Sequence, residues 1–253
     1  MDSEIVPSES SRGPSRNAEL VDALKQGLLL GMAILVLVLP PGAGSLIKAA
    51  SITPAVAAFR VADFGGEAAS PEAQRIAQWA VESGDNGNLF FVIVDKKNAK
   101  VFVFEPGGKL RGATPVLLGL AQGDDTVEGI GKRPLSAVLP EERTTPAGRF
   151  LAEPGRNASG EDVVWVDYAS AVSMHRVRPM EPSERRLERL ASLTAEDNRI
   201  SYGCINVPVD FYEQVIRPAF NARYGVVYVL PETKPLQEVF AAAFKPPPSS
   251  ARM

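Results

Sequence analysis

Two apolar runs rich in β-branched and aromatic residues lie close together near the middle of the chain and constrain its fold. Residues 89–95 read Leu-Phe-Phe-Val-Ile-Val-Asp and residues 100–105 read Lys-Val-Phe-Val-Phe-Glu, with a short polar stretch at 96–99 between them. Such runs are typical of β-strands, and a short polar connection joins neighbouring antiparallel strands. The sequence therefore predicts a β-hairpin that opens a β-rich domain.

Shorter apolar segments continue this pattern and predict the remaining strands. They lie at residues 114–120, 149–152, 163–166, 171–174 and 225–230. A helix is predicted from Pro71 to about Ser83, with Ser70 as its N-cap and Gly84 as its end. Further helices are predicted at 182–193, 210–223 and 236–244. Pro218 should bend or end the second of these helices. Because helices and strands are segregated, the predicted fold class is mainly β and antiparallel, with peripheral helices.

Composition narrows the classes of function. The formal net charge is −3, which argues against a nucleic-acid partner. A single cysteine excludes an intramolecular disulfide, a Cys-rich zinc site and a Cys-x-x-Cys redox pair, and a single histidine leaves few soft metal ligands. No metal or cofactor is predicted, and the sequence gives no indication of oligomeric state.

An apolar stretch near the N-terminus predicts export. Residues 27–39 are apolar throughout and would span about 20 Å as a helix, against a hydrocarbon core of about 30 Å. Residues 27–47 are therefore interpreted either as a signal-peptide core, with cleavage after Ala57, or as a marginal membrane anchor; a buried core helix is a third interpretation. The expected location is the periplasm or cell envelope, with the protein free or anchored to the cytoplasmic membrane.

The only cysteine and the only histidine are the candidate catalytic pair. Cys204 lies in the run Ser-Tyr-Gly-Cys-Ile-Asn at residues 201–206, where Gly203 favours a tight turn that presents a side chain. A lone cysteine is commonly a small buried apolar residue. If this thiol is catalytic, His175 is the one imidazole that can act as its base. An imidazolium neighbour lowers a thiol pKa from about 8.5, so that thiolate becomes the main form.

The backbone of the same run could stabilise a reaction intermediate. Acyl transfer develops a negative charge on the carbonyl oxygen, which preorganised N–H groups can bind. The N–H groups of Tyr202, Gly203 and Cys204 are the predicted oxyanion hole. His175 could later protonate the leaving amine.

Three segments together resemble the catalytic domain of the L,D-transpeptidase (YkuD-like) family. The first is the hairpin of residues 92–108 with a Pro-Val strand after it. The second is Thr-Thr-Pro-Ala-Gly-Arg-Phe at residues 144–150, similar to the family signature Thr-Pro-x-Gly-x-Phe. The third is His175 followed by residues 201–206, similar to the family motif Ser-His-Gly-Cys-x-Arg/Asn. Tyr202 replaces the His of that motif, and the interval 176–200 is longer than in the family.

The resemblance implies a β-sandwich-like fold and peptidoglycan stem peptides as substrate. It implies that Cys204 attacks the carbonyl of the third residue of a tetrapeptide stem, that D-alanine leaves, and that His175 is the base. The acyl group then passes to an amine on another stem, to water or to a D-amino acid. The same resemblance suggests an L,D-carboxypeptidase or cross-link hydrolase as one alternative. A wall-binding module without catalysis is another, supported by Tyr202 and the long interval.

The domain organisation follows from these assignments. Residues 1–26 are expected to be a polar, disordered N-terminus, residues 27–47 the apolar segment and residues 48–70 a linker. Residues 71–87 are predicted as a helix preceding the domain, residues 88–232 as the L,D-transpeptidase-like domain, and residues 233–253 as a C-terminal helix and Pro-rich tail.

Other polar residues near the motifs are candidates for substrate binding. Ser201 and Asn206 flank the cysteine, and Asn206 would either touch substrate or hold the turn. The interval 176–200 is rich in Arg and Glu, and predicts either a solvated helix with ion pairs or a lid in which Arg176 or Arg178 grips a substrate carboxylate. Leucines at 187, 190 and 193 predict one buried face in this segment.

Two other groups of residues are interpreted as structural. Thr145, Pro146 and Gly148 are most simply a turn, and any role in the wall of the cleft comes from the resemblance alone. Trp165, Tyr168 and Met174 are expected in the core in preference to a substrate platform.

Overall fold

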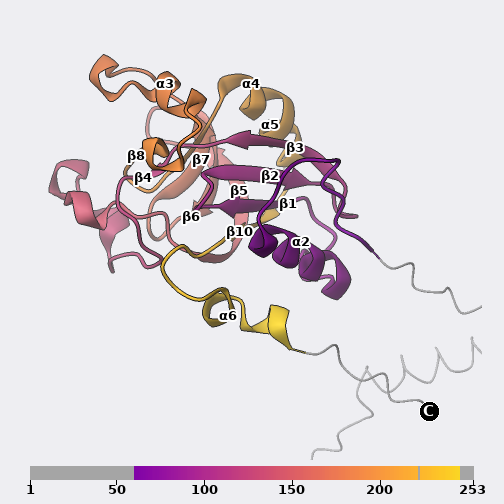
Figure 1. The fold of residues 1–253 in the computed structure, drawn as a ribbon. Helices are drawn as coiled ribbons and strands as arrows, with labels where there is room; N and C mark the ends of the chain where they lie inside the picture. Colours follow the sequence, from indigo (N-terminus) through magenta and orange to yellow (C-terminus); the bar gives the residue numbers. More distant parts are fainter. Residues whose placement is uncertain (1–59, 222, 246–253) are drawn as a thin grey trace, which may run out of the picture. The chain divides into compact units, whose positions relative to one another are not determined.

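A single eight-stranded sheet forms the centre of the computed structural model, which describes residues 60–221 and 223–245 (Figure 1). The strand order is β3-β2-β1-β10-β5-β6-β7-β9. Most neighbours are antiparallel, as predicted, but β1 pairs with β10 and β7 pairs with β9 in parallel. The strands are β1 (Phe91–Asp95), β2 (Lys100–Phe104), β3 (Leu110–Pro115), β5 (Gly148–Arg156), β6 (Asp162–Asp167), β7 (Val172–Arg176), β9 (Ile205–Val207) and β10 (Gly225–Val229).

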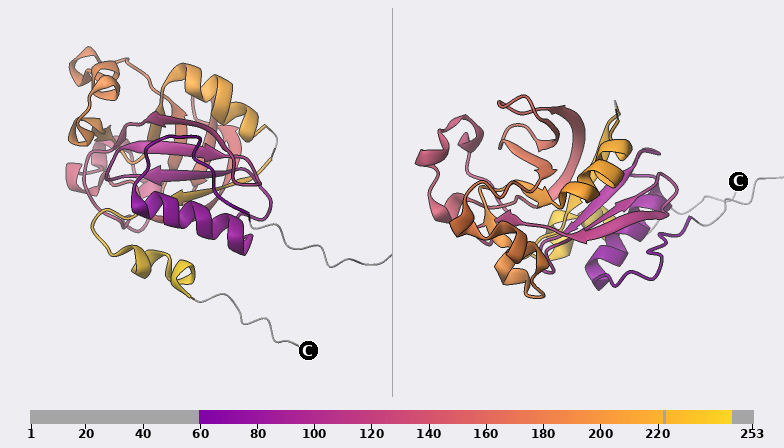
Figure 2. Two further views of the ribbon diagram at one scale, coloured as in Figure 1. Left: turned by 45° about the vertical axis from the view of Figure 1, so that its right-hand side comes forward. Right: turned by 90° about the horizontal axis from the view of Figure 1, so that it is seen from above.

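The long strand β5 joins two halves of this sheet. Its residues 148–152 pair with β10, whereas its residues 153–156 pair with β6. Side chains from both halves meet in one buried cluster, where Val94 and Val229 of one half lie with Val164 and Met174 of the other. The sheet therefore curves around a shared core, which gives the mainly β, sandwich-like architecture that the sequence predicts (Figure 2).

Helix α2 (Pro71–Ser83) covers one face of the first half of the sheet and has the predicted ends. The side chain of Ser70 accepts a hydrogen bond from the N–H of Ala73, and Gly84 ends the helix with a left-handed φ of 70°. Its apolar face packs on aromatic residues of β1 and β2. The predicted helix at 236–244 forms α6 (Leu236–Val239) and the 3-10 turn η8 (Ala241–Phe244), and Phe240 between them joins the same cluster.

The opposite face of β1 and β2 is covered by the segment predicted as a helix at 210–223 (Figure 2). It consists of α4 (Val209–Phe211), the π turn η7 (Tyr212–Ile216) and α5 (Arg217–Ala219). The N–H of Arg217 bonds to the carbonyl of Tyr212, five residues earlier. A wide turn at this point accommodates Pro218, which lacks an N–H and would crowd a regular turn. The helix ends just after Pro218, as expected.

Two predicted elements differ from the structure. The strand predicted at 114–120 is divided, because β3 ends at Pro115 and the short β4 (Leu118–Gly119) pairs in parallel with β8 (Arg199–Ser201) in a separate sheet. The helix predicted at 182–193 contains only the 3-10 turn η5 (Pro182–Glu184) and α3 (Arg186–Ala191). Arg185 separates them, with a left-handed φ of 48°. The remaining 3-10 turns are η2 (Ile130–Lys132), η3 (Leu135–Ala137), η4 (Pro140–Glu142) and η6 (Ala195–Asn198).

The leucine pattern of the 182–193 segment does not produce a buried face. Leu190 is buried, but Leu187 is 56% exposed and Leu193 is fully exposed. A helix of six residues has less than two turns, so it cannot align three leucines on one side.

The predicted segments at 1–26 and 27–47, and most of the linker, lie outside the described residues. Within the described part of the chain, no helix is long and apolar enough to cross a membrane.

Candidate active site

The register between β7 and β9 determines where the thiol and the imidazole lie. His175 pairs with Asn206 across the two parallel strands. Side chains alternate along a strand, so Ser173 and His175 point to one face and Met174 to the core on the other. Cys204 directly precedes β9 and shares the face of Asn206. Its sulfur therefore lies beside Ser173, with 3.7 Å between Sγ and Oγ.

Backbone and side-chain contacts determine the tautomer of the imidazole. The Nδ1 atom of His175 lies 2.7 Å from the carbonyl oxygen of Arg176. A carbonyl oxygen can only accept, so Nδ1 carries the proton in this bond. In the neutral ring, Nε2 then holds the lone pair, and the amide Nδ2 of Asn206 lies 3.3 Å from it. The nitrogen with the lone pair is thus on the strand face that also carries Cys204.

Cys204 and His175 are close enough to shift each other's pKa. Burial raises the pKa of the Cys204 thiol, but a hydrogen bond and the charge of His175, with contacts from Ser173, outweigh this and leave the pKa below its ordinary value. Burial lowers the pKa of His175, but the hydrogen bond and the charge of Cys204 raise it overall. These opposite shifts favour a thiolate–imidazolium pair, the form in which sulfur is the stronger nucleophile.

The turn that presents Cys204 requires glycine at position 203. Gly203 has a φ of 122°, and a Cβ at this position would lie 2.6 Å from the carbonyl oxygen of Thr144. The hydroxyl of Ser201 closes the turn, because it accepts from the N–H of Gly203 at 3.1 Å and donates to the carbonyl of Cys204 at 2.6 Å. Ser201 therefore has a clear role in holding the turn.

A buried threonine of the 144–150 motif holds the same turn from the other side. The Oγ1 atom of Thr145 donates to the carbonyl of Gly203 at 2.9 Å and accepts from the N–H of Gly119 at 2.9 Å. Thr145 has no exposed surface. The sequence interpretation of this residue as part of a simple turn missed this contact. The resemblance had indicated a motif near the cleft, but no local signal identifies a partner 58 residues away.

The three N–H groups predicted as an oxyanion hole differ in their bonding. The N–H of Gly203 is engaged by Ser201. For the N–H groups of Tyr202 and Cys204, no acceptor is found among the residues that the structure describes. The side chain of Tyr202 is partly exposed, and its ring stacks on the guanidinium of Arg143, with Cζ 3.9 Å from the ring centroid.

The two arginines predicted to bind substrate are paired with acidic side chains. Arg176 bonds Glu213 and Asp162, and its guanidinium lies 4.1 Å from the ring centroid of Tyr212. Arg178 pairs with Glu161 from the loop before β6. Both guanidinium groups therefore already have anionic partners within the chain.

A third arginine of the same interval reaches the site instead. Arg186, the first residue of α3, donates from Nη1 to Oδ1 of Asn206 at 2.6 Å. The sequence did not single it out, because the 176–200 interval contains six arginines and spacing alone does not show which one turns inward.

The residues expected in the core are divided between core and surface. Met174 is fully buried, as predicted. Tyr168 is 73% exposed, so its prediction as a core residue is wrong. Trp165 is half-buried, packs edge-on against Tyr168 with ring centroids 5.0 Å apart, and pairs with Ser173 across the sheet. The register places Trp165 on the face of the sheet that carries Cys204.

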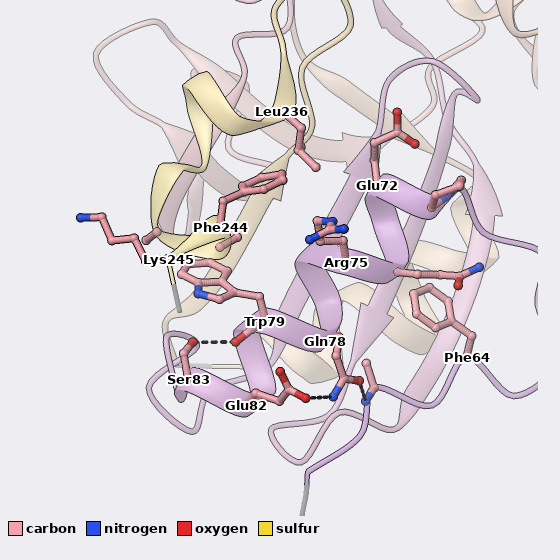
Figure 3. Close-up of a pocket in the computed structure, with 15 residues that line it drawn as sticks. Phe64, Glu72, Arg75, Gln78, Trp79, Glu82, Ser83, Leu236, Phe244 and Lys245 are labelled. Carbon is pink, nitrogen blue, oxygen red and sulfur yellow. Dashed lines mark hydrogen bonds between the residues drawn. The ribbon is translucent and has the colours of Figure 1, made fainter. Parts of the chain in front are cut away.

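A separate groove lies elsewhere on the described part of the molecule. It has a volume of about 1250 Å³ and lies between α2 and η8, where Arg75 and Trp79 face Phe244 (Figure 3). Neither Cys204 nor His175 lines it. Within residues 60–221 and 223–245, no cluster of His, Cys, Asp and Glu could hold a metal ion.

Comparison with known proteins gives structural matches only. No protein-family model and no curated protein matches the chain. The chain is similar to the helical cell shape determining protein Pgp2 from Campylobacter jejuni, with 16% identity and a TM-score of 0.38 over 64% of this chain and 57% of that one. It is also similar to L,D-transpeptidase 1 from Mycobacterium tuberculosis, with 16% identity and a TM-score of 0.30. This match covers 56% of this chain and 61% of that one.

A third similar structure is the catalytic domain of an L,D-transpeptidase from E. faecium, with 17% identity and a TM-score of 0.29 over 56% of this chain and 98% of that one. The chain spans less than two thirds of the length of the first two proteins.

Proposed function

We propose that the protein is an exported cysteine acyltransferase that acts on peptidoglycan stem peptides, as an L,D-transpeptidase does. The observation that carries this proposal is the parallel pairing of β7 with β9, which brings the only thiol and the only imidazole together on one face. The pKa of the thiol is lowered and that of the imidazole is raised, as expected for a nucleophile and its base. The three motifs that resemble the family supply the substrate class.

The proposed reaction has two steps. In the first, the thiolate of Cys204 attacks the carbonyl carbon of the third stem residue, and a C–S bond forms. The N–H groups of Tyr202 and Cys204 stabilise the negative oxygen. The imidazolium of His175 gives its proton to the nitrogen of the terminal D-alanine, the C–N bond breaks, and a thioester remains.

In the second step, an amine from another stem attacks the thioester carbon. His175 takes the proton of that amine, the C–S bond breaks, and the thiolate is restored. If water attacks instead, the same residues carry out hydrolysis, and the enzyme is an L,D-carboxypeptidase. The two activities share every residue named here and differ only in the acceptor.

Mass spectrometry of the purified protein with a carbapenem tests the acyl-transfer chemistry. We expect a covalent adduct on Cys204 that the His175→Ala variant forms much more slowly. No adduct on the parent protein would contradict the proposal and favour a wall-binding module without catalysis.

Digestion of muropeptides identifies the acceptor. Disaccharide-tetrapeptides are incubated with the parent protein and with the Cys204→Ala control, and the products are separated by mass. Cross-linked dimers indicate transpeptidation, whereas tripeptides alone indicate hydrolysis. Neither product with the parent protein would reject this substrate class.

Export is a separate part of the proposal and rests on residues 27–47. A reporter enzyme that is active only outside the cytoplasm, fused after Pro248, tests it. An inactive reporter on a stably expressed fusion would contradict export.

A further inference from the structure

A line of polar contacts links the 176–200 interval to the imidazole of the candidate active site. Arg186 donates to Oδ1 of Asn206 at 2.6 Å, and Nδ2 of Asn206 lies 3.3 Å from Nε2 of His175. We propose that Arg186 is a positioning residue that orients the Asn206 amide and thereby keeps Nε2 of His175 available as a proton acceptor. This inference deepens the proposed function and rests on it.

The direction of the contacts follows from the chemistry of the groups. A guanidinium carries donors only, so the atom of Asn206 that faces Arg186 must be the carbonyl oxygen. The amide nitrogen then faces Nε2 of His175 and the carbonyl oxygen of Cys204, which lies 3.4 Å away. Rotation of the amide by 180° would place its NH₂ group against the guanidinium. Arg186 therefore selects one of the two amide orientations.

The selected orientation favours one protonation state of the base. An amide N–H attracts the lone pair on Nε2 of neutral His175 and repels an N–H at the same atom. Cys204 has the opposite effect, because a thiolate stabilises the imidazolium. Arg186 and Cys204 thus oppose each other at His175, and the positive charge of Arg186 also lowers the pKa of that residue. Because Arg186 lowers the pKa of His175 and Cys204 raises it, His175 can both take and return a proton.

Other charged groups near the imidazole do not replace this effect. Glu184 pairs with Arg186 and compensates part of its charge, so Arg186 acts on His175 mainly through its hydrogen bond to Asn206. On β7, Arg176 is bound by Asp162 and Glu213. On β6, the register that pairs Val164 with Met174 places the apolar Val163 beside His175.

Burial strengthens the hydrogen bond from Arg186 to Asn206 and the contact between Asn206 and His175. Asn206 is 1% exposed, and the side chain of Arg186 is 13% exposed. Solvent and salt screen such contacts weakly compared with pairs on the surface. The amide of Asn206 therefore has almost no contact with bulk solvent that could replace these partners.

The single histidine makes the proposal directly measurable. NMR titration of the Cε1–H of His175 in the full chain, with any tag removed, reports one imidazole pKa without assignment. The Cys204→Ser background removes the coupled titration of the thiol. In this background we expect Arg186→Met to raise the pKa of His175 by about one unit, and Arg186→Lys to stay near the parent value.

Two controls test whether Arg186 acts through the Asn206 amide or only through its positive charge. Arg185→Met removes a positive charge from the neighbouring exposed residue, which pairs with Glu188 and does not contact Asn206. It should leave the pKa of His175 near the parent value. If Arg186 acts through the amide, Arg186→Met should have little further effect in an Asn206→Ala background.

The outcomes that overturn the inference are specific. An unchanged or lower pKa of His175 in Arg186→Met overturns it, as does an equal rise in Arg185→Met. A full shift that persists without the Asn206 amide shows a direct charge effect and also overturns the positioning role. The titration needs no substrate, so a failed muropeptide assay would reject the proposed function without affecting this result.

Discussion

The hydroxyl of Thr145 donates to the carbonyl oxygen of Gly203 at 2.9 Å, which ties the loop before β5 to the turn that presents the cysteine. The same hydroxyl accepts from the N–H of Gly119, so one side chain joins three segments of the chain. No solvent reaches this side chain, and its bonds cannot be replaced by bonds to bulk water. The position of Cys204 therefore depends on a residue far from it in sequence.

Replacing Thr145 by valine keeps the shape and removes both bonds. We expect the free energy of unfolding to fall by about 1–3 kcal/mol, because a buried carbonyl and a buried N–H lose their partner. Denaturant unfolding measures this change, and acylation of Cys204 should slow in parallel. Thr144→Val is the matched control, since the Thr144 hydroxyl bonds to the carbonyl of Asp125 at an exposed position. Equal effects of the two substitutions would contradict the special role of Thr145.

Gly203→Ala should disable the site while the fold remains. A Cβ would approach the carbonyl oxygen of Thr144 to 2.6 Å, and φ of 122° is unfavourable for alanine. The turn must shift, and we expect acylation of Cys204 to fall by about a hundredfold or more. Gly160→Ala has a similar backbone strain at φ of 80° but meets no atom within 4 Å. Near-parental acylation in Gly203→Ala would show that the turn tolerates the shift.

The pH dependence of thiol alkylation should report the pairing of Cys204 with His175. The pKa of Cys204 is lowered, so the alkylation rate of the folded protein should rise through a midpoint below that of an ordinary thiol. His175→Gln removes the imidazolium and leaves the effect of burial, which moves the midpoint to higher pH. Iodoacetamide alkylation from pH 5 to 10 gives both midpoints, and Cys204→Ala gives the background. Identical midpoints in the parent and His175→Gln would disprove the coupling.

A buried ion cluster lies behind the motif that holds the cysteine turn. Lys96 has no exposed surface and donates to Asp124 at 2.8 Å and to the carbonyl of Thr145 at 2.8 Å. Asp124 also accepts from the backbone N–H groups of Glu232, Thr233 and Lys234. Burial raises the pKa of Asp124, but Lys96 and these donors outweigh it and hold the pKa well below its ordinary value.

Removing one member of this cluster should destabilise the fold strongly. Asp124→Asn leaves Lys96 without its nearest anion, and we expect a loss of about 3–5 kcal/mol at neutral pH. Because the pKa of Asp124 is lower in the folded chain, its contribution is complete above about pH 4 and declines as the pH falls further. Unfolding of the parent and Asp124→Asn at several pH values should therefore converge in acid. The exposed pair Lys97–Glu72 offers the control Glu72→Gln, for which a loss below about 1 kcal/mol is expected.

Much of the fold could be predicted, and Cys204 could be singled out as the candidate nucleophile, because the signals are local. The hairpin of residues 89–105 follows from β-branched and aromatic runs around a short polar turn, and α2 from its Ser70 cap and Gly84 end. His175 was the candidate base by elimination, since no other imidazole exists in the chain. The leucine pattern at 182–193 wrongly predicted one continuous helix with a buried face. Periodicity does not reveal that Arg185 interrupts the helix.

The amino-acid sequence by itself determined where most of the strands form, which side chains are chemically able to react, and that glycine precedes the thiol. Only the tertiary structure decided that β7 and β9 pair in parallel and that Thr145 supports the cysteine turn. It also decided that Arg186 contacts Asn206, whereas Arg176 and Arg178 pair with acidic side chains. The physical reason is that register and side-chain partners over long separations depend on how the whole core packs. Local spacing determines the conformation of a segment but not which distant segment it meets.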